Sequence, residues 1–106
     1  MNKYTELSDF EINKKVAEKL GLAYEVTRYG VVTRMSNKEQ WREFNPCNNP
    51  TDAMPIINEY GISLIYQDRK FQFATNDGNI ECCIANQLKA AMIIFLCMKD
   101  AENEKV

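Results

Sequence analysis

The sequence contains no histidine among its 106 residues. Histidine is the usual general base near neutral pH, so its absence excludes Ser-His-Asp and Cys-His catalysis. It also excludes every zinc site that uses an imidazole ligand. No pair of carboxylates has a spacing that requires shared acid–base work, and no glycine-rich phosphate loop occurs. We therefore expect no catalytic residues, no metal, no cofactor and no enzymatic activity.

Strong net charge and long apolar runs are also missing. The net charge is −2 and the pI about 5.2, so we expect no strong electrostatic attraction to nucleic acid or anionic lipid. No apolar run reaches the ~18 residues of a membrane helix. The polar residues 1–6 do not resemble a signal peptide, so we expect a cytoplasmic protein.

The four cysteines lack the spacing of a redox motif or a zinc knuckle. They are Cys47, Cys82, Cys83 and Cys97. In a reducing compartment, disulfides are rare and buried thiols pack as small hydrophobic groups. We therefore predict four free thiols.

Apolar residues make up 45% of the chain and charged residues 26%, as in ordinary globular domains. We expect a single domain over 1–106, with 101–106 a frayed polar tail. A helix is predicted over 9–20, because Ser8 and Glu11 form a capping box and Gly21 suits a left-handed C-cap.

Two short strands are predicted next, over 23–28 and 31–35, either around a turn at Gly30 or as one strand with a bulge there. Residues 36–50 are rich in Asn and Pro and are predicted to be irregular. A second helix follows, with Asn49 as N-cap and Gly61 at its end. Pro55 lies in its first turn, or deeper, where it would kink the helix.

The remaining pattern predicts strands over 62–66, 71–75 and 80–84, the last two joined by a turn at Asn76-Asp77-Gly78-Asn79. A final helix runs from Gln87 to about Asp100 and is apolar nearly all round. It therefore belongs to the core or meets a partner, for instance a second copy of the chain. For that homodimer, the contact residues would be Ile93, Ile94 and Met98.

The predicted fold class is α+β, with the order α-β-(β)-α-β-β-β-α. Short turns connect most strands, so we expect a small, mostly antiparallel sheet of three to five strands packed by three helices. No internal repeat or linker is visible in the residues.

The segment 41–52 is the candidate interaction site, because aromatic anchors and amides share a loop that ends at a helix N-terminus. Alternatively, the aromatics face inward and the Asn side chains satisfy the loop backbone. The candidate residues are Trp41, Phe44, Asn45, Asn48, Asn49 and Asp52.

Basic and aromatic residues also alternate between positions 28 and 42, as in some single-stranded nucleic-acid sites. Glu25, Glu39 and Glu43 interrupt the series, and the chain is acidic overall, so we do not expect nucleic-acid binding. The residues concerned are Arg28, Tyr29, Arg34, Lys38, Trp41 and Arg42.

Three segments resemble the NinX family of small lambdoid-phage proteins. They are Leu7–Asn13, Asn45–Ile57 followed by Gly61-Ile62, and Leu88–Met92. The chain departs from the family pattern at Pro50, where we expect Trp. The resemblance implies an accessory protein of a temperate phage or prophage, acting in the host bacterial cytoplasm, and it implies no reaction.

Two functional classes follow. In the first, the protein binds a host or phage macromolecule, for instance to modulate replication or host defence. In the second, it is a small-molecule or nucleotide-binding module, or a minor hydrolase, that uses the Asn-rich loop. The missing catalytic groups favour the first class.

Overall fold

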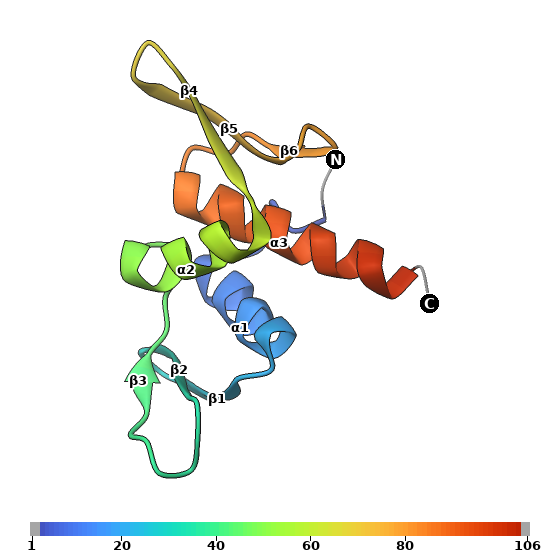
Figure 1. Ribbon diagram of the computed structural model, residues 1–106. Helices are drawn as coiled ribbons and strands as arrows, with labels where there is room; N and C mark the ends of the chain where they lie inside the picture. The colour runs from blue at the N-terminus through green and yellow to red at the C-terminus, as the bar shows by residue number, and fades with distance from the viewer. Residues whose placement is uncertain (1–2, 105–106) are drawn as a thin grey trace.

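The computed structural model describes residues 3–104 and confirms the α+β class and the predicted order of elements (Figure 1). Among these residues, no helix is both long enough and apolar enough to cross a membrane. The elements are α1 (Asp9–Leu20), β1 (Ala23–Thr27), β2 (Gly30–Arg34), β3 (Arg42–Glu43), α2 (Pro50–Tyr60), β4 (Ser63–Gln67), β5 (Lys70–Asn76), β6 (Ile80–Cys82) and α3 (Gln87–Glu104).

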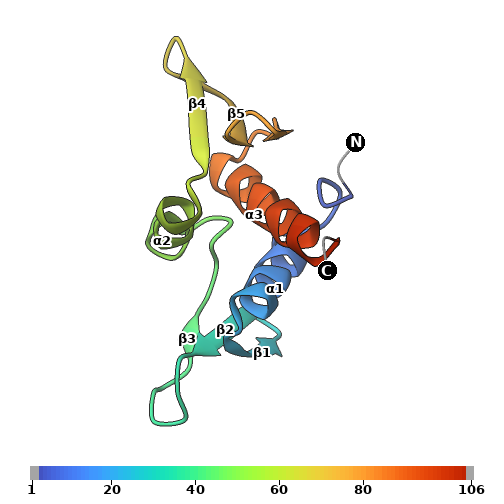
Figure 2. The same cartoon turned by 45° about the vertical axis from the view of Figure 1, so that its right-hand side comes forward.

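The strands form two antiparallel sheets at opposite ends of the molecule, where the sequence led us to expect one (Figures 1 and 2). The first has the order β1-β2-β3 and the second β4-β5-β6. All three helices lie between the sheets, and this separation explains why no strand of one reaches the other.

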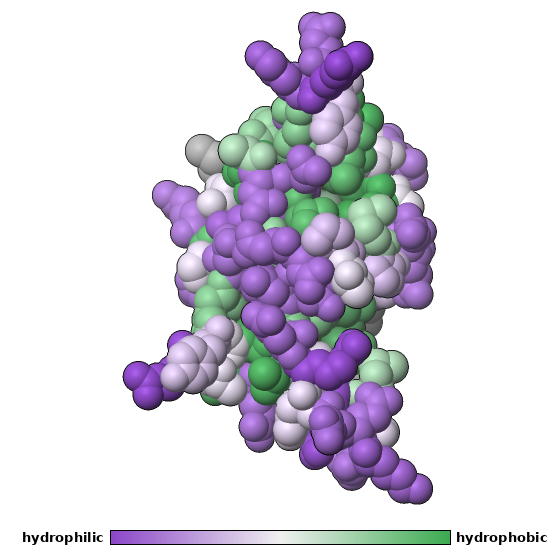
Figure 3. Space-filling model, turned by 90° about the vertical axis from the view of Figure 1, so that its left-hand side faces the viewer, coloured by the Kyte–Doolittle hydropathy of each residue, from purple (hydrophilic) through white to green (hydrophobic). Residues whose placement is uncertain are grey.

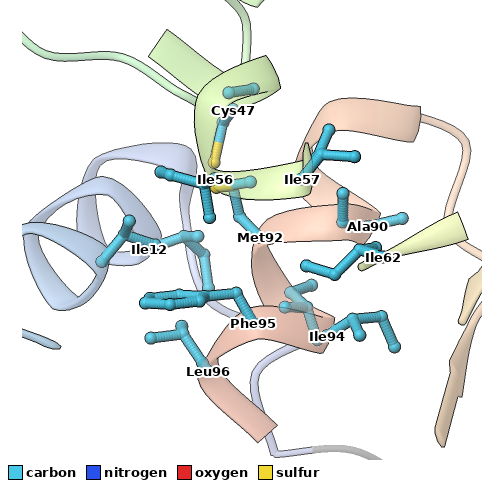
Figure 4. Close-up of a cluster of buried hydrophobic side chains, with 14 of the residues drawn as sticks. Ile12, Cys47, Ile56, Ile57, Ile62, Ala90, Met92, Ile94, Phe95 and Leu96 are labelled. Atoms are coloured by element: carbon cyan, nitrogen blue, oxygen red, sulfur yellow. The ribbon is translucent and has the colours of Figure 1, made fainter. Parts of the chain in front are cut away.

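The long helix α3 supplies the centre of the core. It contacts α1, α2 and every strand of the second sheet. Figure 4 shows side chains from α1, α2 and α3 converging around Phe95. Ile93 and Ile94 are fully buried within the chain, as the core interpretation of this helix predicts, while Met98 is half-buried. A homodimer through this helix stays a prediction.

The chain repeats one arrangement, a helix followed by a left-handed glycine and a tight hairpin. Gly21 (φ 76°) and Gly61 (φ 64°) end α1 and α2. Leu22 N–H donates to the Ala17 carbonyl at 3.1 Å, and Ile62 N–H donates to the Ile57 carbonyl at 3.0 Å. When residues 9–34 are aligned with residues 49–74, only one pair of positions is identical, Gly21 and Gly61. The repeat is therefore invisible in the sequence, because only geometry and burial recur.

The predicted helix starts are confirmed. Ser8 and Glu11 form the capping box of α1, and the Asn49 side chain accepts the Thr51 N–H at the start of α2. Pro55 lies inside α2.

Several boundaries differ from the prediction. Residues 23–34 form two strands, and the turn residues are Arg28 and Tyr29, one position earlier than the predicted glycine turn. Within the segment predicted to be irregular, Arg42 and Glu43 pair with β2 as β3. A strand of two residues forms only because it pairs with its neighbour, and it is too short to show the alternating pattern of a strand in the sequence. Residues 101–104 continue α3, whereas 105–106 lie outside the described residues.

Candidate binding groove

A groove of about 250 Å³ separates α2 from the first sheet. Its apolar lining comes from the end of α1 and the turn after it, from the residues that follow β2 and β3, and from one side of α2. Charged side chains of both signs surround it. The apolar residues are Leu20, Leu22, Met35, Phe44, Pro55, Ile56 and Tyr60, and the charged ones are Arg34, Glu39, Arg42, Asp52 and Glu59. Figure 3 faces the α2 side of the molecule and shows hydrophobic patches between hydrophilic surface there.

On the sheet side, Arg34 is held against the only tryptophan. Its guanidinium carbon lies 4.4 Å from the centre of the Trp41 ring, within the range of a cation–π contact. One terminal nitrogen of Arg34 donates to Asn37 Oδ1 at 3.4 Å. The Nε atom is buried and has no hydrogen-bond partner among the described residues. Arg34 therefore lines the groove and also carries a buried donor without a partner among the described residues.

On the helix side, the first turn of α2 is fixed to the loop before it. Asp52 Oδ2 accepts the Asn45 N–H at 2.9 Å, which holds this carboxylate near the positive end of the helix. Glu59 lies exposed further along α2. The two walls therefore differ in charge: the helix wall carries only carboxylates, whereas the sheet side carries two arginines together with Glu39.

The predicted segment 41–52 reaches three neighbouring hollows rather than one. Phe44 and Asp52 line the groove, and Trp41 lines a shallow depression beside it with Met35 and Gln40. Asn45 and Asn48 line a third hollow on the side of β2 and α1. Asn49 lines none of these three and caps α2.

The asparagines of this segment also belong to a hydrogen-bonded network. Asn13 donates to Asn45 Oδ1 at 2.8 Å and accepts the Cys47 N–H at 3.1 Å. Asn48 donates to Asn45 Oδ1 at 3.1 Å. Asn86 donates to the Cys47 carbonyl at 2.8 Å. These bonds join α1, the loop and the start of α3, and they account for the asparagines in structural terms.

An ion pair extends the network. Lys89 Nζ lies 3.0 Å from Asp9 Oδ1 and donates to the Leu7 carbonyl at 2.8 Å. The hydrogen bond from Asn48, followed by the Lys89 contacts, outweighs partial burial and lowers the pKa of Asp9. Burial raises the pKa of the Cys47 thiol to about 12. The thiol is therefore neutral and unreactive at physiological pH.

Phe44 is almost fully buried and Trp41 is half-buried against Arg34. The aromatics thus seal the sheet side more than they project from it. Sequence reasoning missed Arg34 as a groove residue, and it also missed Pro55 and Tyr60. The apolar stripe of α2 indicated burial only, and nothing in it showed that one side would border a groove.

The basic and aromatic residues between positions 28 and 42 do not form one face. Arg28 stacks on Tyr29 at the hairpin turn, 5.5 Å from its ring centre, whereas Arg34 and Trp41 lie beside the groove. No cluster of three or more Cys, Asp or Glu side chains in the described part of the chain is placed to hold a metal ion.

The family model described as Bacteriophage P22, NinX matches residues 3–99. This chain belongs to the NinX family. No curated protein matches it. The three segments that resemble NinX proteins in sequence contain the start of α1, the loop with α2, and the start of α3. These segments meet at the asparagine network, so part of the NinX pattern in this chain is explained by the bonds that hold its helices together.

Proposed function

We propose that this NinX-family protein is a phage or prophage accessory protein that binds a segment of a host or phage protein in the groove between α2 and the first sheet. This proposal rests on the size and the lining of the groove. Its volume, about 250 Å³, lies below the ~300–1,000 Å³ of typical ligand sites and suits one or two anchor side chains. An apolar pocket with a polar rim is the usual anatomy of an interaction hot spot.

The sheet wall supports a polypeptide occupant. A buried donor without a partner costs ~1–3 kcal/mol. Arg34 Nε is shielded from solvent, so a shift of this side chain on binding would bring it within reach of a backbone carbonyl or carboxylate of the bound segment. Trp41 and Arg42 stand beside it, and tryptophan and arginine are the residue types enriched at hot spots.

The charge of the lining disfavours a nucleotide. Three carboxylates (Glu39, Asp52, Glu59) face the groove against two guanidinium groups (Arg34, Arg42), so a phosphate would meet a net negative surface. The Asn-rich loop has few free hydrogen-bonding groups for a nucleotide or a hydrolytic substrate, because its amides are already bonded within the network.

The proposal is tested by affinity capture from host bacterial lysate with three versions of the protein. Pro55→Arg places a long charged side chain in the groove at an exposed position of α2. Asn58→Arg makes the same substitution at an exposed position of the same helix that does not line the groove. Circular dichroism and thermal unfolding confirm that both variants fold.

We expect the wild type and Asn58→Arg to retain the same protein, and Pro55→Arg to lose at least about tenfold in affinity, which corresponds to ~1.4 kcal/mol. Equal retention by Pro55→Arg would contradict the groove as the site. Trp41 fluorescence then provides a titration signal for the purified partner, and the same titration with a panel of nucleotides is expected to give no change.

A further inference from the structure

Edge strands usually carry charges that prevent unwanted pairing. The two sheets end in four such strands within the described residues: β1, β3, β4 and β6. β1 contains Glu25, β3 consists of Arg42 and Glu43, and β6 contains Glu81. β4 alone has neither a charged residue nor a proline. Its sequence is Ser-Leu-Ile-Tyr-Gln from Ser63 to Gln67.

The backbone of β4 is also regular. Ile65 pairs with Phe73 while Tyr66 pairs with Phe71, so the extra residue of the bulge is Gln72 on the inner strand β5. A bulge on the edge strand itself would discourage pairing, but β4 has none. No other strand of the described residues pairs with its outer row of N–H and C=O groups, which can therefore match another strand.

The hairpin that carries this edge projects from the body of the molecule (Figure 1). Asp68 (φ 54°) and Arg69 (φ 67°) form its tight turn. Ile65 is 36% exposed and Tyr66 47% exposed. Figure 3 shows hydrophobic surface directly below the hydrophilic tip at the top of the view. The edge is therefore accessible, apolar and extended.

We propose that β4 is a self-association edge, on which a second copy of the chain adds its own β4 in antiparallel orientation. The two second sheets then form one continuous sheet across a two-fold axis. Full overlap of the strands places Ile65 opposite Ile65 of the second copy.

The distribution of charge supports a second copy of the chain as the strand that pairs with β4. Every copy carries a net charge of −2, so self-association needs a surface where like charges do not meet. In the overlapped register, Leu64 faces Tyr66 of the second copy and Ser63 faces Gln67 of the second copy, so all pairs are neutral. The charged turn residues lie beyond the overlap. A five-residue strand pair is a small interface, so the dimer is weak and depends on concentration.

Sedimentation equilibrium of the full chain, over a wide range of concentration, tests the proposal with Ile65→Lys and Val26→Lys. Val26 is a matched control, because it is 49% exposed on the edge strand β1 of the first sheet. We expect the wild type and Val26→Lys to dimerise alike. Ile65→Lys puts two ammonium groups across the axis, and we expect it to raise the dissociation constant at least about tenfold. A monomeric wild type at every concentration, or equal weakening by both substitutions, would overturn the proposal.

Cross-linking tests the register even where Ile65→Lys perturbs folding. In a Cys83→Ser background, which removes the exposed native thiol, we expect Ile65→Cys to form an intermolecular disulfide under mild oxidation. Val26→Cys serves as the control and should remain monomeric. Equal cross-linking at both positions, or none at Ile65, would contradict the register. Pro55→Arg is expected to dimerise like the wild type, so failure here leaves the groove proposal intact.

Discussion

The two halves of this protein build the same unit and use it differently. In both, a helix ends at a left-handed glycine and the chain returns as a tight antiparallel hairpin. The first hairpin lies against its own helix, α1, whereas the second lies against α3. Local signals therefore fix the unit, and tertiary contacts decide which helix its hairpin packs against.

This difference separates the two candidate surfaces. The first sheet, with Arg34 and Arg42, faces α2 across the groove. The second sheet buries Ala74 and Cys82 near α3 and leaves β4 as a neutral edge. In the two proposals, the first half supplies a charged wall for a foreign segment, and the second half supplies a strand for a second copy.

The largest expected effect is at α3, which both halves share. Ile94 is fully buried, so Ile94→Glu places an unpaired charge in the core at a cost of several kcal/mol, on the order of the whole stability. We expect loss of the cooperative thermal transition and of near-ultraviolet circular dichroism. A variant in which one half remains cooperatively folded would show that the halves are independent.

A smaller effect distinguishes the helix caps. The Asn86 side chain accepts N–H groups of Leu88 and Lys89 at the start of α3 and also donates to the Cys47 carbonyl. Asn49 makes one capping bond to α2. We expect Asn86→Ala to cost ~2 kcal/mol and Asn49→Ala ~1 kcal/mol in urea unfolding. A larger loss for Asn49→Ala than for Asn86→Ala would mean that the cap of α2 contributes more to stability than the bonds of Asn86 do.

The paired glycines test the repeat itself. Gly21 and Gly61 both adopt positive φ, and a Cβ on either would contact nothing. Only backbone strain therefore opposes alanine, at ~1 kcal/mol for each position. We expect equal decreases in unfolding free energy for Gly21→Ala and Gly61→Ala. Clearly unequal values would mean that the two turns are not equivalent.

The smallest expected effect is a loss of stability at low pH, which depends on Asp9 in the first half of the chain. The folded pKa of Asp9 is lowered, so its contribution to stability is present above the unfolded pKa and is lost as pH falls through the folded value. We expect the wild type to lose stability below about pH 4 more steeply than Asp9→Asn. Parallel pH curves from urea unfolding would show that the Asn48 and Lys89 contacts contribute nothing.

The sequence predicts well where the signal is local. Ser8, Asn49 and the two glycines mark helix ends, and alternation marks the hairpins. It predicts poorly where tertiary contacts decide. The strand β3 exists only because Arg42 and Glu43 meet β2, and the division into two sheets depends on the helices between them. Likewise, the segment 41–52 stays a predicted interaction site, of which Arg42, Phe44, Thr51 and Asp52 line the groove. Arg34 and Tyr60, which also border the groove, give no signal before the fold brings them together.

The central claim, that the groove is where a protein partner binds, is tested most directly by site-specific photo-cross-linking in host bacterial cells. A benzophenone amino acid at Met35, which is 73% exposed at the groove, is compared with one at Tyr29, which is 86% exposed at the first hairpin turn. We expect one discrete cross-linked protein at Met35, none at Tyr29, and loss of the Met35 product when Pro55→Arg is added. A product that forms at Tyr29 alone, or persists at Met35 with Pro55→Arg, would contradict the account.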